Sequence, residues 1–153
     1  MILTAEETET AGYNLVELLA GFYGLRVRTI DLEAVIPSTK GWPKHRRASY
    51  RTRKVKGEYR HMIKLTADRP LTVTLVSCVA HELCHANQAE QHGTPTFMFC
   101  YHDALKRHGY RENRFELEAR QMAHIVTSWL LERTSIETDQ QLAELCGLKW
   151  RTA

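Results

Sequence analysis

The sequence predicts a single α+β domain with an N-terminal helix, a small three-stranded sheet, and then a series of helices. Three observations carry this prediction. Apolar residues recur at helical spacing at both ends of the chain, strand-like alternation fills its middle, and no linker, repeat or low-complexity segment divides residues 1–153. A chain of this length is sufficient for one ordinary hydrophobic core. The order of helix, sheet and helices is typical of the α+β class.

The first half of the chain is predicted to supply one helix and the sheet. Residues 4–7 form a Thr-x-x-Glu capping box, and apolar residues follow it at helical spacing, which predicts a helix over about 5–23. Apolar and polar residues then alternate in three runs, and a segment with proline and glycine separates the first run from the other two. These runs predict strands over 25–30, 48–55 and 58–66, a loop over 36–47, and a hairpin turn at Lys56-Gly57.

The second half of the chain is predicted to be helical. Asp68-Arg69-Pro70 interrupts the strand pattern, and a largely apolar segment with helical spacing follows it up to Gly93. Later helical segments stop at glycines, and Asn113 and Thr138 are suitable N-cap residues. The expected helices span about 71–91, 96–106, 113–132 and 137–146.

The composition disfavours a disordered chain and a membrane protein. Hydrophobic residues make up 43% of the chain and charged residues 25%, as in folded globular proteins. No apolar run approaches the roughly 20 residues of a membrane-spanning helix. The N-terminal segment is acidic, unlike an export signal, and the four cysteines form no C-x-x-C pair. We therefore expect free thiols and a cytoplasmic protein without membrane contact.

Charge is distributed unevenly along the chain. The net charge is +3, but residues 40–64 contain ten lysines and arginines against one acid, so the remainder of the chain is net negative. Such asymmetry favours an acidic or polyanionic partner, and nucleic acid held by phosphate contacts is one candidate. A solvated strand face, an edge strand protected against aggregation, or selection of acidic peptides explains the same pattern. The cations concerned include Arg46, Arg47, Arg51, Arg53, Lys54 and Lys56, with Trp42 and Tyr50 close in sequence.

The segment His81-Glu82-Leu83-Cys84-His85 carries the strongest chemical signal. On a helix, His81 and His85 lie one turn apart on one face, where two imidazoles reach the same metal ion. Zn²⁺ suits neutral imidazole nitrogens and keeps one position open for water in catalytic sites. Glu82 is placed to accept a proton from a metal-polarised water as general base. The alternative is a buried helix whose histidines are satisfied by ordinary protein groups.

A catalytic zinc site usually takes a third protein ligand. Glu116 is the main candidate, because it begins a helix whose small residues one and two turns later allow close approach to the motif helix. Glu118 competes with it, but the two carboxylates lie about 200° apart around the helix, so only one faces the metal. His92 and His102 are the imidazole alternatives.

An enzyme with such a site also needs a group that stabilises the oxyanion of the transition state. Several residues downstream of the motif are candidates for this role. His124 is preferred, because it lies two turns beyond Glu116 on roughly the same helix face. The other candidates are Tyr101, Tyr110 and Arg120.

The pattern HELCH at 81–85, followed by ELEA at 116–119, resembles the gluzincin metallopeptidases, and within them the small ImmA/IrrE-like group. The resemblance covers about residues 58–130 and implies a zincin-like metallopeptidase domain that cleaves a protein or peptide substrate. It also implies that the strand over 58–66 is the sheet edge that holds an extended peptide. The implied roles are Zn²⁺ ligands for His81, His85 and Glu116, and general base for Glu82.

A second resemblance concerns His92-Gly93 with Phe97, which is similar to the H-G-x-x-F region of SprT-like proteases. Those proteases act on proteins bound to DNA, and the resemblance implies His92 as the third ligand. The sequence therefore supports two hypotheses. The first is a zinc-dependent metallopeptidase. The alternative is an SprT-like protease, or a catalytically silent zincin-fold regulator of phage or mobile-element origin, that binds DNA or a DNA-bound protein through residues 40–64.

Overall fold

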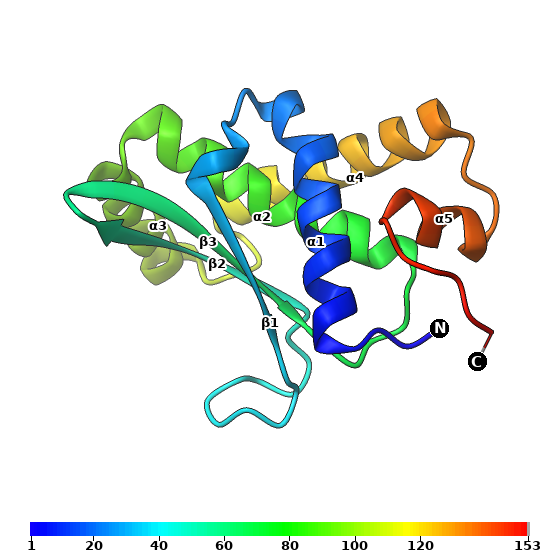
Figure 1. Ribbon diagram of the computed structural model, residues 1–153. Helices are drawn as coiled ribbons and strands as arrows, with labels where there is room; N and C mark the ends of the chain where they lie inside the picture. The colour runs from blue at the N-terminus through cyan, green and yellow to red at the C-terminus, as the bar shows by residue number, and fades with distance from the viewer. Residues whose placement is uncertain (153) are drawn as a thin grey trace.

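A computed structural model describes residues 1–152 and confirms the α+β class (Figure 1). The chain begins with helix α1 (Ala5–Leu19) and two short 3-10 helices, η1 (Ala20–Tyr23) and η2 (Val27–Thr29). The strands are β1 (Ile30–Val35), β2 (Ala48–Val55) and β3 (Glu58–Thr66). The later helices are α2 (Val73–His92), α3 (Thr94–His108), α4 (Arg114–Thr134) and α5 (Asp139–Leu145).

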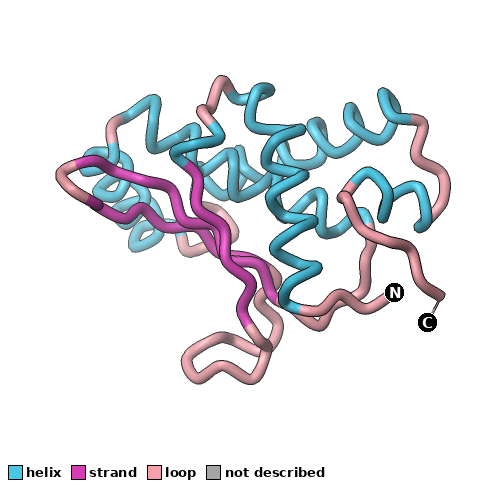
Figure 2. Tube along the Cα trace, in the orientation of Figure 1, coloured by secondary structure: helices cyan, strands magenta, loops and turns pink. Residues whose placement is uncertain are grey.

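The helices and the sheet form two layers around a main core, and a smaller apolar cluster joins α2, α3 and α4 (Figure 2). Helix α2 packs along α4 and also contacts α1, α3 and the strands, so the helix that carries the His-Glu-x-x-His pattern lies at the centre of the molecule. Leu15 of α1, Ile63 of β3 and Leu83 of α2 are fully buried where the layers meet. Burial of each such side chain contributes about 1.5–3 kcal/mol, which makes this core the main source of stability.

Strand β3 lies in the middle of the sheet, whose order is β1-β3-β2. It pairs in parallel with β1 and antiparallel with β2, so the expectation that residues 58–66 form the sheet edge is wrong. The burial of β3 shows why it is central. Ile63 and Leu65 are buried on the face toward the helices, and Met62 and Thr66 are buried on the opposite face. The edge strands are β1 and β2.

The first strand lies at 30–35, so the prediction of a strand over 25–30 is wrong. The apolar and polar alternation there belongs partly to the 3-10 helix η2. The true strand is hard to detect because Asp31 and Glu33, residue types that are depleted in strands, occupy its outer face. Arg60 of β3 donates hydrogen bonds to both carboxylate oxygens of Asp31, at 2.9 and 2.8 Å. These bonds hold the pKa of Asp31 below its usual range.

The remaining element predictions agree closely with the structure. Strands β2 and β3 have the predicted bounds and are joined by Lys56-Gly57, both with positive φ, as a two-residue turn of type I′ requires. The capping boxes at Thr4 and Thr138 and the Asn113 cap are formed. Helix α3 is longer than expected, because it starts directly after Gly93 with proline in its first turn. No described helix has the length and apolar character needed to cross a membrane.

Candidate metal centre

Three side chains from two neighbouring helices converge at one point. His81 and His85 come from α2, and Glu116 comes from the first turn of α4. The Nε2 atoms of His81 and His85 lie 2.8 and 2.9 Å from the same carboxylate oxygen, Oε1 of Glu116. One ligand atom from each residue lies within 4.8 Å of the other two. The structure therefore brings together the three residues that the sequence singles out as metal ligands.

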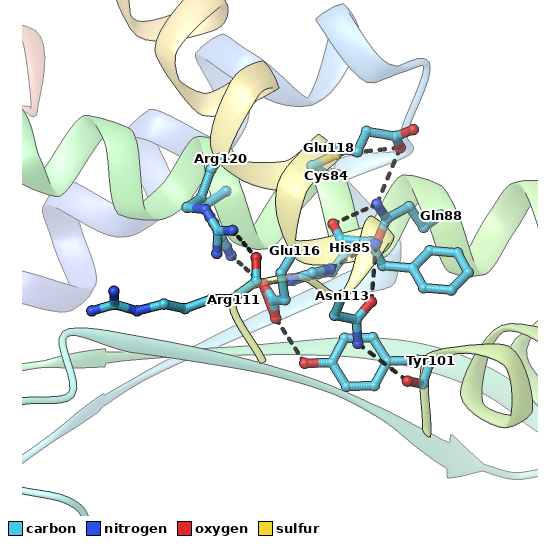
Figure 3. Close-up of polar contacts among 11 residues, drawn as sticks. Cys84, His85, Gln88, Tyr101, Arg111, Asn113, Glu116, Glu118 and Arg120 are labelled. Atoms are coloured by element: carbon cyan, nitrogen blue, oxygen red, sulfur yellow. Dashed lines mark hydrogen bonds and ion pairs between the residues drawn. The ribbon is translucent and has the colours of Figure 1, made fainter. Parts of the chain in front are cut away.

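Local structure explains why Glu116 reaches the histidines. Asn113 starts α4, since its side chain accepts a hydrogen bond from the backbone N–H of Phe115 at 3.0 Å. The same side chain donates to the backbone carbonyl of Tyr101 at 3.2 Å, which ties the start of α4 to α3 (Figure 3). Ala119, one turn after Glu116, is fully buried, and its small size lets α4 approach α2 closely. The first turn of α4 is thus fixed against the motif helix.

The buried side chain of Gln88 orients one of the two histidines. Its Oε1 accepts a hydrogen bond from Nδ1 of His85 at 2.8 Å, so Nε2 of His85 faces Glu116. Its Nε2 donates to the backbone carbonyl of Phe115 at 3.0 Å and to Glu118 at 3.1 Å (Figure 3). Outer partners of this kind fix the tautomer and ring orientation of metal-binding histidines. Gln88 is not among the site residues expected from the sequence, although its position one turn after His85 is the signal that identifies it.

The carboxylate of Glu116 is held ionised and fixed in orientation. The hydroxyl of Tyr101 donates to Oε2 of Glu116 at 2.7 Å, which leaves Oε1 for the histidines (Figure 3). Burial alone would raise the pKa of Glu116, but the hydrogen bonds from His81, His85 and Tyr101 hold it well below its usual range. Burial lowers the pKa of His85, but the hydrogen bond to Glu116 outweighs this effect and raises it. A positive charge is therefore stabilised between these side chains, where a metal ion would replace the protons.

Glu82 is a buried carboxylate without a hydrogen-bond donor among residues 1–152. Its side chain lines the same cleft as His81 and His85. Burial raises its pKa, and the charges of the neighbouring histidines oppose that effect. Its oxygens are not among the fully buried side-chain atoms that lack a hydrogen-bond partner, so the carboxylate reaches the solvent of the cleft. It is therefore placed to accept a proton from a molecule in the cleft.

The other predicted residues lie at varied distances from this centre. Tyr101, Tyr110 and His102 line the cleft, whereas Glu118 accepts from Gln88 and lies outside the ligand group. The ring of His92 is exposed and packs against Phe115, and Arg120 donates to the backbone carbonyl of Arg111.

The preference for His124 as the residue that stabilises the oxyanion is corrected by the structure. His124 is exposed and does not line the cleft. The physical reason is the helix period. Eight residues after Glu116 correspond to a rotation of about 80° around α4, which turns His124 away from the ligand group.

The cations predicted between residues 40 and 64 point to more than one surface. Arg46 and Arg51 line the cleft, and Arg47 lines a small separate pocket. Arg53 lies 3.5 Å from Asp31 on the outer face of the sheet. Lys54 lies over the ring of Tyr59, and Lys56 is in the hairpin turn.

The cleft has a volume of about 730 Å³, which is in the range of sites for small ligands or short peptide segments. Helices α2, α3 and α4 supply the side that holds the metal centre, and β2 supplies the opposite side. The ring of Tyr50 in β2 lies 6.0 Å from that of His85. The metal centre is therefore open to the cleft next to an edge strand.

Two imidazole nitrogens and one carboxylate oxygen are a donor set that suits Zn²⁺, and three protein ligands leave a fourth position free. Their convergence on one point defines a candidate metal-binding protein with the ligand pattern of a catalytic site. Comparison of the chain with protein-family models, curated proteins and solved structures finds no match.

We expect Gln88→Leu to lower zinc affinity by about 10–100-fold, the usual effect of losing an outer hydrogen-bond partner of a ligand. Without the Gln88 carbonyl oxygen, the His85 ring loses its fixed tautomer and orientation. Zinc affinity is measured by competition with a coloured chelator. Gln91→Leu, on the exposed side of the same helix, is the matched control. Equal zinc affinity in the two variants would show that Gln88 does not orient His85.

Proposed function

We propose that this protein is a zinc-dependent metallopeptidase that hydrolyses peptide bonds of a protein substrate. The observation that carries the proposal is the convergence of His81, His85 and Glu116 on the wall of a cleft that also contains the buried Glu82. A structural metal site would use a closed set of four ligands, whereas this group has three and opens onto the cleft beside Glu82. The sequence resemblance to gluzincins supports the same assignment.

Glu82 is the proposed general base. Zn²⁺ in a site with an open position acts as a Lewis acid and lowers the pKa of water toward neutrality. Glu82 then accepts the proton of the attacking water and passes it to the leaving nitrogen of the peptide bond. Its burial raises its pKa, which brings the carboxylate closer to the value suited to both accepting and releasing a proton.

Tyr110 is the proposed residue that stabilises the oxyanion. The hydroxyl of Tyr101 is already committed to Glu116, whereas Tyr110 lines the cleft and remains about half exposed. Partial burial and the nearby carboxylate of Glu116 raise the pKa of Tyr110, so its hydroxyl stays protonated at neutral pH. A protonated phenol is a suitable hydrogen-bond donor to a developing oxyanion.

The substrate strand is proposed to add to β2. Strand β3 is central and has no free edge for a further strand. Strand β2 is an edge strand and lies beside the candidate metal centre. An extended peptide bound along this edge would place successive carbonyl groups along the cleft. Main-chain hydrogen bonds would supply affinity that does not depend on the peptide sequence.

The position of His92 favours this proposal over the SprT-like alternative. That alternative requires His92 as the third metal ligand, but its ring is exposed and packs against Phe115 at a centroid distance of 6.0 Å. Glu116 instead shares one oxygen between both motif histidines. The ligand group therefore has the composition expected of the gluzincin type.

Removal of the metal is expected to abolish hydrolysis. Purified protein is analysed for metal content and then incubated with a mixture of unstructured peptides, with products identified by mass spectrometry. We expect one zinc ion per chain, cleavage in the untreated sample, no cleavage after dialysis against a chelator, and recovery when zinc is restored. Bound zinc without any cleavage would instead support the catalytically silent regulator, and failure to bind zinc would exclude both.

A further inference from the structure

The cleft extends beyond the metal centre, past β2, to the loop between β1 and β2. In Figure 1 this loop projects from the end of the sheet. The extension is predominantly basic, because one carboxylate, Glu33, faces several cations there. The cations are Lys40, Arg46, Arg51 and Lys64.

The backbone of β2 offers unpaired hydrogen-bonding groups along this part of the cleft. In a hairpin closed by a two-residue turn, the flanking residues Val55 and Glu58 form a bonded pair, and bonded pairs recur at every second position. The hydrogen bond from Thr66 N to the Arg47 carbonyl, at 2.9 Å, follows this alternation. The other residues of β2 direct their N–H and C=O groups away from β3, toward an edge without a strand partner in residues 1–152. They include Ala48, Tyr50 and Thr52.

The two faces of a strand added to this edge would meet different surroundings. Side chains alternate between the faces of a sheet, so every second residue of the peptide would face the helices, as Tyr50 does beside His85. The residues between them would lie on the outer face, which Arg51 shares with Met62 and Arg53. Charge on the outer face would therefore act on alternate residues of a bound segment.

Arg51 and Arg46 are the two arginines among these cations, and an arginine can form a two-pronged hydrogen-bonded pair with a carboxylate. On the outer face, Asp31 already pairs with Arg60 and Arg53, at 2.8 and 3.5 Å. In contrast, no carboxylate in residues 1–152 forms a salt bridge with Arg46 or Arg51, and both side chains are exposed in the cleft. Both guanidinium groups can therefore form ion pairs with acidic side chains, and the charge of Arg46 also acts on the carboxylate of Glu82 in the cleft.

The side chain of Arg46 is held in position before any peptide binds. Its guanidinium lies over the ring of Trp42, 5.1 Å from the centroid. The indole N–H of Trp42 donates to Thr66 Oγ1 at 2.9 Å, and that hydroxyl donates to the backbone carbonyl of Arg46 at 2.6 Å. A cation held in this way loses less side-chain entropy when it binds a partner.

We propose that this cleft selects an extended peptide segment with acidic side chains at alternate positions, which adds to the free edge of β2 and contacts Arg46 and Arg51. The proposal names the substrate class of the peptidase, so its biological meaning rests on the proposed function. The binding preference itself does not require catalysis, because it depends on β2 and the two arginines.

The test compares two fluorescent peptides of about ten residues, long enough to span a strand. One alternates Glu with Val, and the other has Gln in place of every Glu. Binding to the zinc-loaded protein is measured by fluorescence anisotropy, and cleavage of the same peptides by mass spectrometry. We expect about 2- to 30-fold tighter binding of the acidic peptide, the range for two exposed ion pairs, and a smaller difference at high salt.

Two double variants with equal loss of charge localise the effect. In Arg46→Gln/Arg51→Gln most of the preference for the acidic peptide should be lost, whereas in Arg53→Gln/Lys54→Gln it should persist. Equal binding of the two peptides to the unchanged protein would overturn the proposal without any variant. Equal losses in the two double variants would also overturn it, because they would indicate a general effect of net charge.

A single-stranded oligonucleotide is measured in the same assay. If it binds more tightly than the acidic peptide and the Arg46/Arg51 variant abolishes that binding, the cleft binds nucleic acid and the proposal is wrong. A different result would show that only the peptidase proposal is wrong. The acidic peptide would then bind with the expected preference, but the zinc-loaded protein would give no cleavage product.

Discussion

Glu82→Gln is expected to lower the rate of peptide hydrolysis by about 10²–10⁴-fold, the usual contribution of a general base, and to leave zinc affinity nearly unchanged. Glutamine has the shape of glutamate but cannot accept the proton of the attacking water. Because Glu82 is not part of the convergent ligand group, the three donor atoms remain in place. Hydrolysis is followed with a quenched fluorescent peptide, and zinc is quantified in the same samples.

The control for this substitution is Glu132→Gln, which removes one carboxylate from an exposed position on α4. Its hydrolysis rate should equal that of the unchanged protein. Burial raises the pKa of Glu82, so removal of its charge should not lower the melting temperature of the Gln variant. A Glu82→Gln protein that is folded, zinc-loaded and fully active would refute the role of Glu82 as general base.

The sequence predicts the parts of this structure that depend on local rules. The helix with His81 and His85 follows from apolar spacing and from the glycine that ends it, and the hairpin of β2 and β3 follows from alternation around Lys56-Gly57. The start of α4 follows from the side chain of Asn113, which caps the helix one turn before Glu116. Each of these features is determined by residues within a few positions of one another.

Features that depend on long-range packing were not predictable in the same way. The strand that carries Asp31 is masked by its acidic outer face, and its partner Arg60 lies 29 residues away. The order of the strands depends on whether β1 pairs with β3 or with β2, and alternation alone does not indicate which of the two strands it joins. The buried His61, whose ring nitrogens contact Tyr50 at 2.7 Å and Glu90 at 2.8 Å, joins β2, β3 and α2 without any sequence motif.

The candidate metal centre combines both kinds of information. The spacing of His81 and His85 is local, and it is sufficient to place two imidazoles on one helix face. The choice of Glu116 over Glu118 requires the rotation of α4 relative to α2, which the structure supplies through the buried Ala119. Glu118 instead accepts a hydrogen bond from Gln88, so the carboxylate rejected as a ligand supports the residue that orients His85.

Glu116→Ala is expected to reduce zinc affinity by more than the roughly 10–100-fold loss that follows removal of an outer hydrogen-bond partner. Two imidazoles alone leave the ion without its anionic ligand. The substitution also removes the acceptor of the Tyr101 hydroxyl, so the metal-free protein should lose about 1–3 kcal/mol of unfolding free energy. Zinc affinity is measured by competition with a chelator, and stability by denaturant unfolding in its presence.

Glu118→Ala is the matched control, because it removes a carboxylate two residues further along the same helix. It should retain most of the zinc affinity and should still show the zinc-dependent rise in melting temperature, which reflects binding to the folded state alone. Glu116→Ala should show little of that rise at the same zinc concentration. The opposite pattern, with zinc lost in Glu118→Ala and kept in Glu116→Ala, would mean that α4 presents its other face to the metal. The ligand set and the assignment of the open position would then both be wrong, since they depend on Oε1 of Glu116 lying between the two histidines.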